Sequence, residues 1–399
     1  MAGRDGPAGA PAGSGATRLE VCIHNIHSMM EHSRNQHNGE EEELVLLNDS
    51  SLLSHQLGRD LSMNCLIRCS RFDYATLALL NKDFHSLIKS GLLYRLRRKA
   101  NIVEYWVYYS CSHLEWEAFD PNGGRWMKLP KMPLNEFFQS SDKESLAVGT
   151  ELLVFGRDVM SPIIYKYNIL TNIWSLGMSM NTPRCLFASA SHHELAFIAG
   201  GCDPMGNILS SAELYNSETE KFEILPSMNK ARKLCSGFFM DGKFYVIGGI
   251  GDGDMMQLTC GEEFNPITKT WKPIPDMLPR RIDGVVNVTA PPNKAPPLVA
   301  VANNILYAAD YGEQVVRRYE KEQNSWVIVG GLPERMATVN GWGLAFRACG
   351  DNLIFIGGVG GRMVKIYSCI PQQGEALQWN LLASNESRNF VFNCTVMGC

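Results

Sequence analysis

Residues 195–222 read LAFIAGGCDPMGNILSSAELYNSETEKF, and residues 243–271 read KFYVIGGIGDGDMMQLTCGEEFNPITKTW. Both stretches begin with a short apolar run that closes on a glycine pair, and both end on two aromatic residues around a polar turn. The apolar runs are too short for a lone helix and rich in β-branched and aromatic residues, which predicts buried strands. The polar turn between the aromatic residues predicts an antiparallel hairpin.

The same arrangement recurs along most of the chain. Six aromatic residues mark it, at intervals of 48, 48, 49, 55 and 53 residues: Trp126, Trp174, Phe222, Trp271, Trp326 and Trp379. In the first five copies a second aromatic residue precedes the marker, with six residues between the two; in the last copy eleven residues separate Tyr367 from Trp379. A repeat of about 50 residues that contains several short strands predicts a β-propeller.

Each blade of a propeller needs four strands. A further apolar run precedes the inner strand of every copy but the first, and residues 390–399, FVFNCTVMGC, form a spare strand at the end of the chain. We expect this spare strand to complete the first blade and so close a ring of six blades over residues 100–399. Closure of this kind removes exposed strand edges.

The glycine pairs, the spaced aromatic pairs and the period together resemble kelch repeats. The resemblance covers most of the chain and implies an all-β, six-bladed kelch β-propeller. A propeller of this kind is a rigid platform that holds partners.

The residues before the propeller differ in composition. Residues 1–50 open with Gly, Ala, Pro and Ser and later carry the acidic run Glu40–Glu43, which predicts a disordered N-terminal tail. Four histidines lie in this tail: His24, His27, His32 and His37. A metal site would need a rigid scaffold and further ligands, so we expect a solvated tail and no bound metal.

Residues 51–99 carry helical spacing. Leu57, Leu61 and Cys65 recur every four residues, and further apolar residues recur every three or four residues up to Ile88. Asp73 is a candidate N-cap of a second helix, and Asn81 or Asp83 of a third. The sequence therefore predicts a small α-helical domain before the propeller.

This helical stretch resembles an F-box. The residues that fit the family pattern are Leu57, Asp60, Leu61, Leu66, Ile67, Leu77, Leu80, Phe84, Leu87 and Ile88. The proline that usually follows the first leucine is replaced by Gly58. An F-box directly before a kelch ring is the architecture of plant F-box/kelch-repeat proteins, which this chain resembles.

The resemblance implies a non-catalytic substrate receptor of an SCF-type E3 ubiquitin ligase. The F-box would bind a Skp-type adaptor and through it a cullin, and the propeller would hold the target protein for ubiquitination and degradation. The candidate adaptor contacts are Leu57, Leu61, Leu66, Ile67, Leu77, Leu80 and Phe84, although some of these must instead form the helical core. A kelch scaffold without a role in degradation is the alternative, and the residue that favours it is Gly58.

Five arginines recur with the propeller period, at intervals of 48, 49, 54 and 53 residues: Arg184, Arg232, Arg281, Arg335 and Arg388. All lie in predicted links between an outer strand and the next inner strand, which gather on one face of the ring. Exposed there, they would form a basic rim for carboxylates or phosphates of a substrate. Alternatively, each arginine bonds a neighbouring blade or backbone carbonyls. An enlarged link at residues 282–297 either adds specificity to this face or is a plain exposed insertion.

Composition and motifs argue against other functions. The formal net charge of −4 indicates no bias toward nucleic acid or acidic membranes, and no apolar run is long enough for a membrane helix. The 12 cysteines include no CxxC pair; Cys185, Cys235, Cys349 and Cys394 fall in predicted strands as small buried residues of a reducing compartment. The adjacent His192 and His193 do not complete a copper-oxidase site, and the glycine run at 248–254 precedes no helix that could bind a nucleotide. We therefore expect no catalytic residues and no cofactor, and a location in the nucleus, the cytoplasm or both.

Overall fold

The computed structural model describes residues 59–112, 114–133, 138, 144–158, 161–253, 257–278, 294–360, 362–388 and 390–399. The predicted tail with its histidines, Leu57, Arg281 and most of the enlarged link lie outside these residues. The chain divides into two compact units, Met1–Ile102 and Val103–Cys399. Within the part of the chain just given, no helix has the length and apolar character to cross a membrane.

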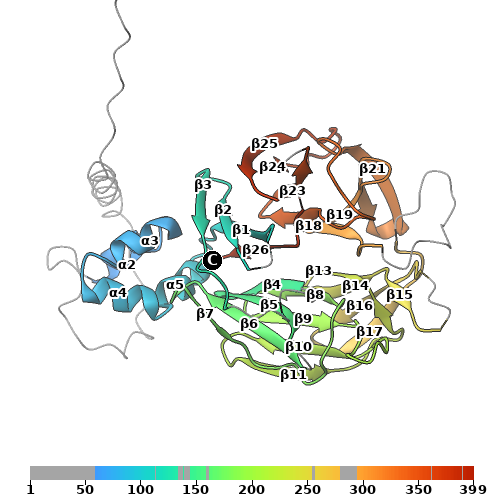
Figure 1. The fold of residues 1–399 in the computed structure, drawn as a ribbon, viewed down its shortest axis with the longest axis horizontal. Helices are drawn as coiled ribbons and strands as arrows, with labels where there is room; N and C mark the ends of the chain where they lie inside the picture. The colour runs from blue at the N-terminus through green and yellow to red at the C-terminus, as the bar shows by residue number, and fades with distance from the viewer. Residues whose placement is uncertain are drawn as a thin grey trace, which may run out of the picture. The chain divides into compact units, whose positions relative to one another are not determined.

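The second unit is a β-propeller of four-stranded antiparallel sheets, as the period predicts. Its innermost strands neighbour one another in a closed ring, each contacting the innermost strand of the next sheet (Figure 1). In ring order these strands are β26 (Asn393–Gly398), β4 (Glu144–Val148), β8 (Ala188–His192), β13 (Ser236–Met240), β18 (Leu298–Ala302) and β22 (Ala345–Cys349). The prediction of a six-bladed propeller is confirmed within the described residues.

The three outer positions of the sheets are filled in chain order. The second strands are β1 (Tyr105–Ser110), β5 (Glu151–Arg157), β9 (Leu195–Ala199), β14 (Lys243–Ile247), β19 (Ile305–Asp310) and β23 (Asn352–Val359). The third strands are β2 (Glu117–Asp120), β6 (Pro162–Asn168), β10 (Ala212–Asn216), β16 (Gly261–Asn265), β20 (Val315–Glu320) and β24 (Met363–Cys369). The outer strands are β3 (Arg125–Lys128), β7 (Ile173–Leu176), β11 (Lys221–Leu225), β17 (Thr270–Ile274), β21 (Ser325–Gly331) and β25 (Asn380–Glu386). The short helix η1 (Lys321–Gln323) forms the turn before β21.

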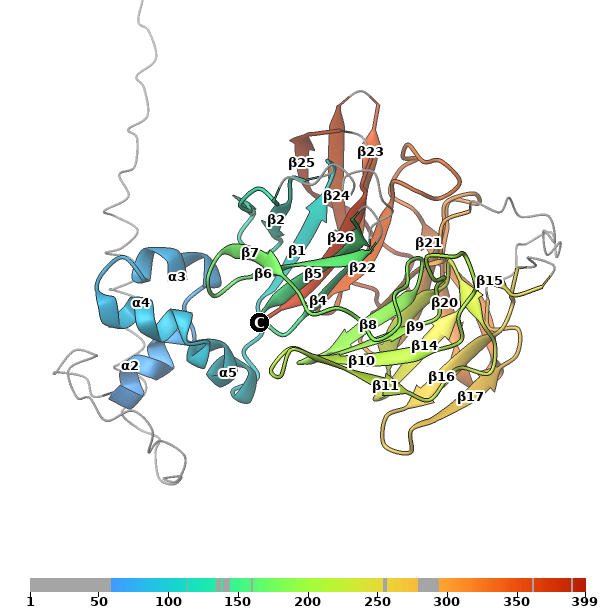
Figure 2. The ribbon, with the colours of Figure 1, turned by 60° about the horizontal axis from the view of Figure 1, so that its bottom comes forward.

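The last strand of the chain closes the ring. β26 pairs with β1 over six residue pairs, from Tyr105–Gly398 to Ser110–Asn393, so the first sheet has the order β26-β1-β2-β3. Figure 2 shows the red β26 beside the blue-green β1. The first blade thus combines the two ends of the propeller, in the way the spare strand at 390–399 indicates.

The periodic aromatic residues are register partners in the outer hairpins. Five pairs lie directly opposite each other: Phe119–Trp126, Tyr167–Trp174, Tyr215–Phe222, Phe264–Trp271 and Tyr319–Trp326. Such cross-strand aromatic pairs stabilise a sheet beyond the area that they bury. In the sixth blade a register shift after Ile366 places Tyr367 opposite Leu381 instead of Trp379.

Four of the tryptophan markers also join neighbouring blades. Each donates its indole N–H, at 2.7 to 2.9 Å, to a backbone carbonyl at or just after the end of the previous blade's outer strand: Trp174 to Pro130, Trp271 to Pro226, Trp326 to Met277 and Trp379 to Gly331. The links between blades are therefore anchored at regular positions, and this makes the ring a rigid support.

The first unit contains the predicted helices. They are α2 (Arg59–Leu66), α3 (Arg71–Leu77), α4 (Lys82–Lys89) and α5 (Leu92–Lys99). Asn81 caps α4 by accepting hydrogen bonds from the N–H groups of Asp83 and Phe84. The expectation that Asp73 caps the preceding helix is wrong, because α3 begins earlier and Ser70 is its N-cap.

Candidate functional site

Hydrogen bonds and an aromatic contact connect the helices of the first unit in its core. The Tyr74 hydroxyl donates to the Leu66 carbonyl at 3.0 Å, and Arg97 donates from Nη1 to the Cys69 carbonyl at 2.7 Å. The rings of Tyr74 and Tyr94 meet edge to face, with 5.7 Å between their centroids. These contacts tie α5 to the segment between α2 and α3, so the unit has a defined core despite its small size.

Several apolar side chains of this unit remain outside the core. Leu79 is 85% exposed and Leu80 51% exposed, and both lie in the turn that follows α3. Leu61 on α2 and Phe72 on α3 are each 37% exposed. Large apolar side chains left exposed on so small a unit are candidates for contact with a partner.

The candidate adaptor contacts divide between this surface and the core. Leu61 and Leu80 are exposed, and Leu77 and Phe84 are half-buried. Leu66 and Ile67 are buried, so the expectation that they contact an adaptor is corrected: they fill the core. Sequence reasoning missed Leu79, because it extended the helical spacing through Leu80 whereas α3 ends at Leu77.

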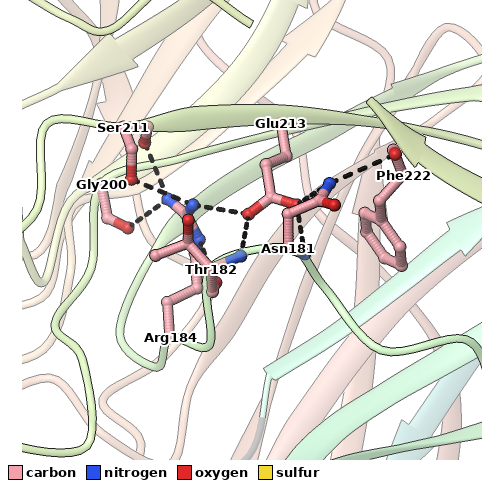
Figure 3. A network of polar contacts seen from close by, with 7 residues as sticks. All are labelled: Asn181, Thr182, Arg184, Gly200, Ser211, Glu213 and Phe222. Atoms are coloured by element: carbon pink, nitrogen blue, oxygen red, sulfur yellow. Dashed lines mark hydrogen bonds and ion pairs between the residues drawn. The ribbon is translucent and has the colours of Figure 1, made fainter. Parts of the chain in front are cut away.

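In the propeller, Arg184 lies inside the wall of the third blade (Figure 3). Its guanidinium donates to the carbonyls of Gly200 at 3.0 Å and Ser211 at 2.7 Å, and pairs with the Glu213 carboxylate at 2.8 Å. Burial lowers the pKa of Arg184, an effect that the neighbouring Glu213 opposes. Both charged groups are out of water and are satisfied by each other and by the backbone.

Glu213 also holds the link that carries Arg184. It accepts hydrogen bonds from the backbone N–H of Asn181 and of Thr182, each at 2.8 Å, and from the Asn181 side chain at 3.0 Å. One carboxylate therefore fixes both the arginine and the backbone before it.

The fourth blade repeats this network one period later. Arg232 donates to the carbonyls of Gly248 at 3.1 Å and Cys260 at 3.0 Å, and pairs with Glu262 at 2.9 Å. Glu262 accepts from the N–H groups of Asn229 at 2.7 Å and Lys230 at 3.0 Å. The arginine period in these two blades is the period of a structural ion pair.

The expectation that Arg184 and Arg232 face a substrate is therefore wrong. The side chains of both are 0% exposed, and their donors are directed at the wall of their own blade. Sequence reasoning missed the partners Glu213 and Glu262, although each stands two residues before the first aromatic residue of its hairpin, in AELY and GEEF. This repeated position of the two glutamates in the sequence could have identified them as the partners of the arginines.

The remaining arginines of the series behave differently. Arg335 and Arg388 are exposed in the links before β22 and β26. In the sixth blade the ion pair has the opposite order of charges, because Glu334 of the link binds Lys365 of β24 at 2.9 Å. Arg335 is thus not used in such a pair. It is exposed on the face of the propeller that carries the links between blades, called the linker face below.

A channel of about 390 Å³ runs between the innermost strands. Small residues such as Ser189 and Gly237 line it together with aromatic residues such as Phe187 and Phe238. Two of the lining residues are charged, Glu144 of β4 and Arg347 of β22. Arg347 donates from Nε to the Cys394 carbonyl at 3.1 Å and from Nη1 to the Phe346 carbonyl at 3.0 Å, so it joins β22 to β26. The channel wall is thereby braced by a charged side chain.

Comparison with known proteins agrees with this architecture. The kelch motif matches residues 183–229 and 231–278, which include both Arg–Glu ion pairs. The Arabidopsis thaliana F-box/kelch-repeat protein At1g74510 is 56% identical over 354 residues, which cover 86% of this chain and 78% of the relative. This chain belongs to the F-box/kelch-repeat protein family. Two further Arabidopsis members, At1g26930 and SKIP11, are each 55% identical; the matches cover 88% of this chain and 84% and 76% of the relatives.

Membership of the F-box/kelch-repeat family gives the two units their interpretation. The four helices fit a small F-box-like domain, and the propeller is the kelch part. Together they support the role of a substrate receptor, in which one unit connects to other proteins and the other provides a binding surface. The Arg–Glu ion pairs lie within the two matched kelch motifs and connect the link before each blade to the wall of that blade.

Proposed function

We propose that this F-box/kelch-repeat protein is the substrate-recognition subunit of an SCF-type E3 ubiquitin ligase. The helical unit binds a Skp-type adaptor, which connects it to a cullin. The propeller binds a target protein, which is then ubiquitinated and degraded. The observation that carries the proposal is the exposed apolar surface of the helical unit, in a chain whose relatives are named for an F-box.

The exposed apolar side chains of Leu61, Phe72, Leu79 and Leu80 are suited to contact with a protein partner. Burial of a leucine side chain stabilises an association by about 1.5–3 kcal/mol. Leu79, 85% exposed, retains most of this gain for binding, and Leu80, 51% exposed, retains about half of it. Leu79 does not fill the core and Leu80 does so only in part, so we expect a chain with both residues replaced to fold.

The linker face of the propeller is the surface we propose for the target. Each sheet is a four-stranded meander, so the links between blades and the turns between second and third strands emerge on the same face. Arg335 and Arg388 contribute positive charge there, and Met205, 89% exposed in the turn between β9 and β10, contributes apolar surface. These side chains favour a target segment that carries carboxylates or phosphates beside apolar residues.

The chain's contribution to the reaction is proximity. Holding a target next to a ubiquitin-charged enzyme converts a bimolecular encounter into an intramolecular one. The chemistry belongs to other subunits, and no residue of this chain is assigned to it.

The test is co-purification of the full chain with a Skp-type adaptor and a cullin. We expect the cullin to be retained only when the adaptor is present, and retention to fail for the variant Leu79→Ser with Leu80→Ser. Ile267→Ser is the matched control, because Ile267 is an apolar residue 92% exposed in a hairpin turn of the propeller. A folded chain that retains neither protein would contradict the proposal and leave a kelch scaffold without a role in degradation.

A further inference from the structure

Two thiols lie in contact on the linker face of the third blade. The sulfur atoms of Cys185 and Cys202 are 3.5 Å apart. Cys185 belongs to the link before β8, and Cys202 follows the glycine pair after β9. We propose that these two cysteines are a redox-sensitive pair, which a peroxide converts to a disulfide.

The backbone already holds the two residues in a pairing that a disulfide can span. They form an antiparallel bridge in which Cys185 N–H donates to Cys202 O at 3.0 Å and Cys202 N–H donates to Cys185 O at 2.8 Å. The Cα atoms of such hydrogen-bonded pairs are about 5.5 Å apart, within the range of about 4.4–6.8 Å seen for disulfides. The bond therefore needs movement of the side chains and little movement of the chain.

Glycine and arginine keep these backbones close. Gly201 has φ of 90°, and a Cβ atom there would collide with the Cys185 carbonyl oxygen. Arg184, which directly precedes Cys185, is fixed by its bonds to Gly200, Ser211 and Glu213. The approach of the two thiols is thus a consequence of the architecture of the blade.

The fold does not require sulfur at these positions. In the fourth blade the corresponding antiparallel bridge joins Lys233 of β12 (Arg232–Lys233) to Ile250 of β15 (Ile250–Gly251). The same backbone pairing therefore forms with side chains that cannot be oxidised to a disulfide. Packing alone does not explain why the third blade has cysteine at both positions.

One molecule of hydrogen peroxide is sufficient to oxidise both thiols. Cys185 is half-buried and Cys202 is buried, so the peroxide meets Cys185 first. The Cys185 sulfur attacks one peroxide oxygen, the O–O bond breaks, and a sulfenic acid and water form. The Cys202 sulfur then attacks the sulfenic sulfur, and the hydroxyl leaves as a second water once the thiol proton is transferred. Both thiols are oxidised, and the peroxide is reduced to two molecules of water.

The pair is also connected to the mouth of the channel. The N–H of Leu186, the residue after Cys185, donates to the carboxylate of Glu144, which lines the channel. Forming the bond shortens the separation of the sulfurs from 3.5 Å to about 2.05 Å, next to the residue that makes this contact. The disulfide itself does not depend on the proposed ligase function; only an effect on target capture would.

The test uses the native full chain treated with hydrogen peroxide, then unfolded, alkylated and digested with trypsin. The tryptic peptide 185–221 carries Cys185 and Cys202 and no other cysteine, whereas the peptide 234–243 carries only Cys235, a buried thiol that serves as an internal control. We expect the first peptide to have lost both thiol hydrogens and to take no alkyl group, and dithiothreitol to restore both sites. The control peptide should remain alkylated throughout.

The variants Cys185→Ser and Cys202→Ser separate this pair from other oxidation. Each should abolish the disulfide within peptide 185–221 and leave one alkylated cysteine after reduction. Peroxide that leaves both thiols alkylated, or that converts Cys185 to higher oxides without a bond to Cys202, would overturn the proposal. So would a bond that forms only when the chain is unfolded with urea before oxidation.

Discussion

Replacing Arg232 by Met tests whether the periodic arginines hold the propeller together. Met keeps a long unbranched side chain but removes every donor of the guanidinium. The substitution leaves the carbonyls of Gly248 and Cys260 and the Glu262 carboxylate without this partner inside the wall. We therefore expect a loss of folding stability.

The size of the loss follows from those three contacts. All three bonds come from the charged guanidinium, and a hydrogen bond of a charged group contributes about 1.5–3 kcal/mol, so the lower end of the sum is roughly 4.5 kcal/mol. Breaking a buried ion pair by removing one partner costs about 3–5 kcal/mol, which is consistent with that figure. The midpoint of thermal unfolding should fall by roughly 5–10 °C for a domain of this size.

The assay is chemical and thermal unfolding of the full chain, monitored by near-ultraviolet circular dichroism. Arg335→Met is the matched control, since Arg335 is exposed, and we expect it to change stability by no more than about 0.5 kcal/mol. The double variant Arg232→Met with Glu262→Met should be less unstable than the sum of the single changes, because it leaves no unpaired charge. An Arg232→Met chain that unfolds at the wild-type midpoint would refute the reasoning.

Three further predictions concern closure, pH and target capture. Removal of residues 393–399 leaves β1 without its inner partner, so the cooperative unfolding transition should be lost; a truncated chain that melts like the intact one would show that closure is dispensable. Burial raises the pKa of Glu151 above 4.5, although the bonds from Lys166 and Tyr215 oppose this shift. The native state therefore binds the carboxyl proton of Glu151 more tightly than the unfolded state does, and the stabilisation from the protonated carboxyl group is lost as the pH rises above 4.5. The stability of Glu151→Gln relative to wild type should therefore increase as the pH is raised from 4.5 in urea titrations, and a constant difference would contradict this. Arg335→Ala with Arg388→Ala should weaken target capture from plant extract in quantitative mass spectrometry at unchanged melting temperature, and unchanged capture would remove these arginines from the target surface.

The repeat made most of the fold predictable from sequence. Residues that recur every blade, such as Tyr215 with Phe222 and Phe264 with Trp271, are opposite one another in the hairpins, because a turn of fixed length sets the register. The shift in the sixth blade was signalled by the longer separation of Tyr367 from its tryptophan.

The candidate sites were less predictable, for physical reasons. A structural ion pair and a ligand contact repeat with the same period, so the spacing of Arg184 and Arg232 did not show which side of the wall they occupy. Their place was decided by Glu213 and Glu262, which lie 29 and 30 residues further along the chain. Leu66 is likewise buried where helices meet: Tyr74 bonds to its backbone carbonyl and Arg97 of α5 bonds to Tyr74, a contact that the leucine spacing alone did not show.

Titration of the purified full chain with a purified Skp-type adaptor tests the central claim most directly. We predict one-to-one binding to the wild type and to Ile267→Ser, and a roughly 30- to 1000-fold weaker affinity for Leu79→Ser with Leu80→Ser, from the apolar area that these two leucines leave exposed. All three chains should unfold cooperatively, with at most a small loss of stability in the double leucine variant from the half-buried Leu80. Absence of binding by the folded wild-type chain, or an unchanged affinity of the double leucine variant, would contradict the account.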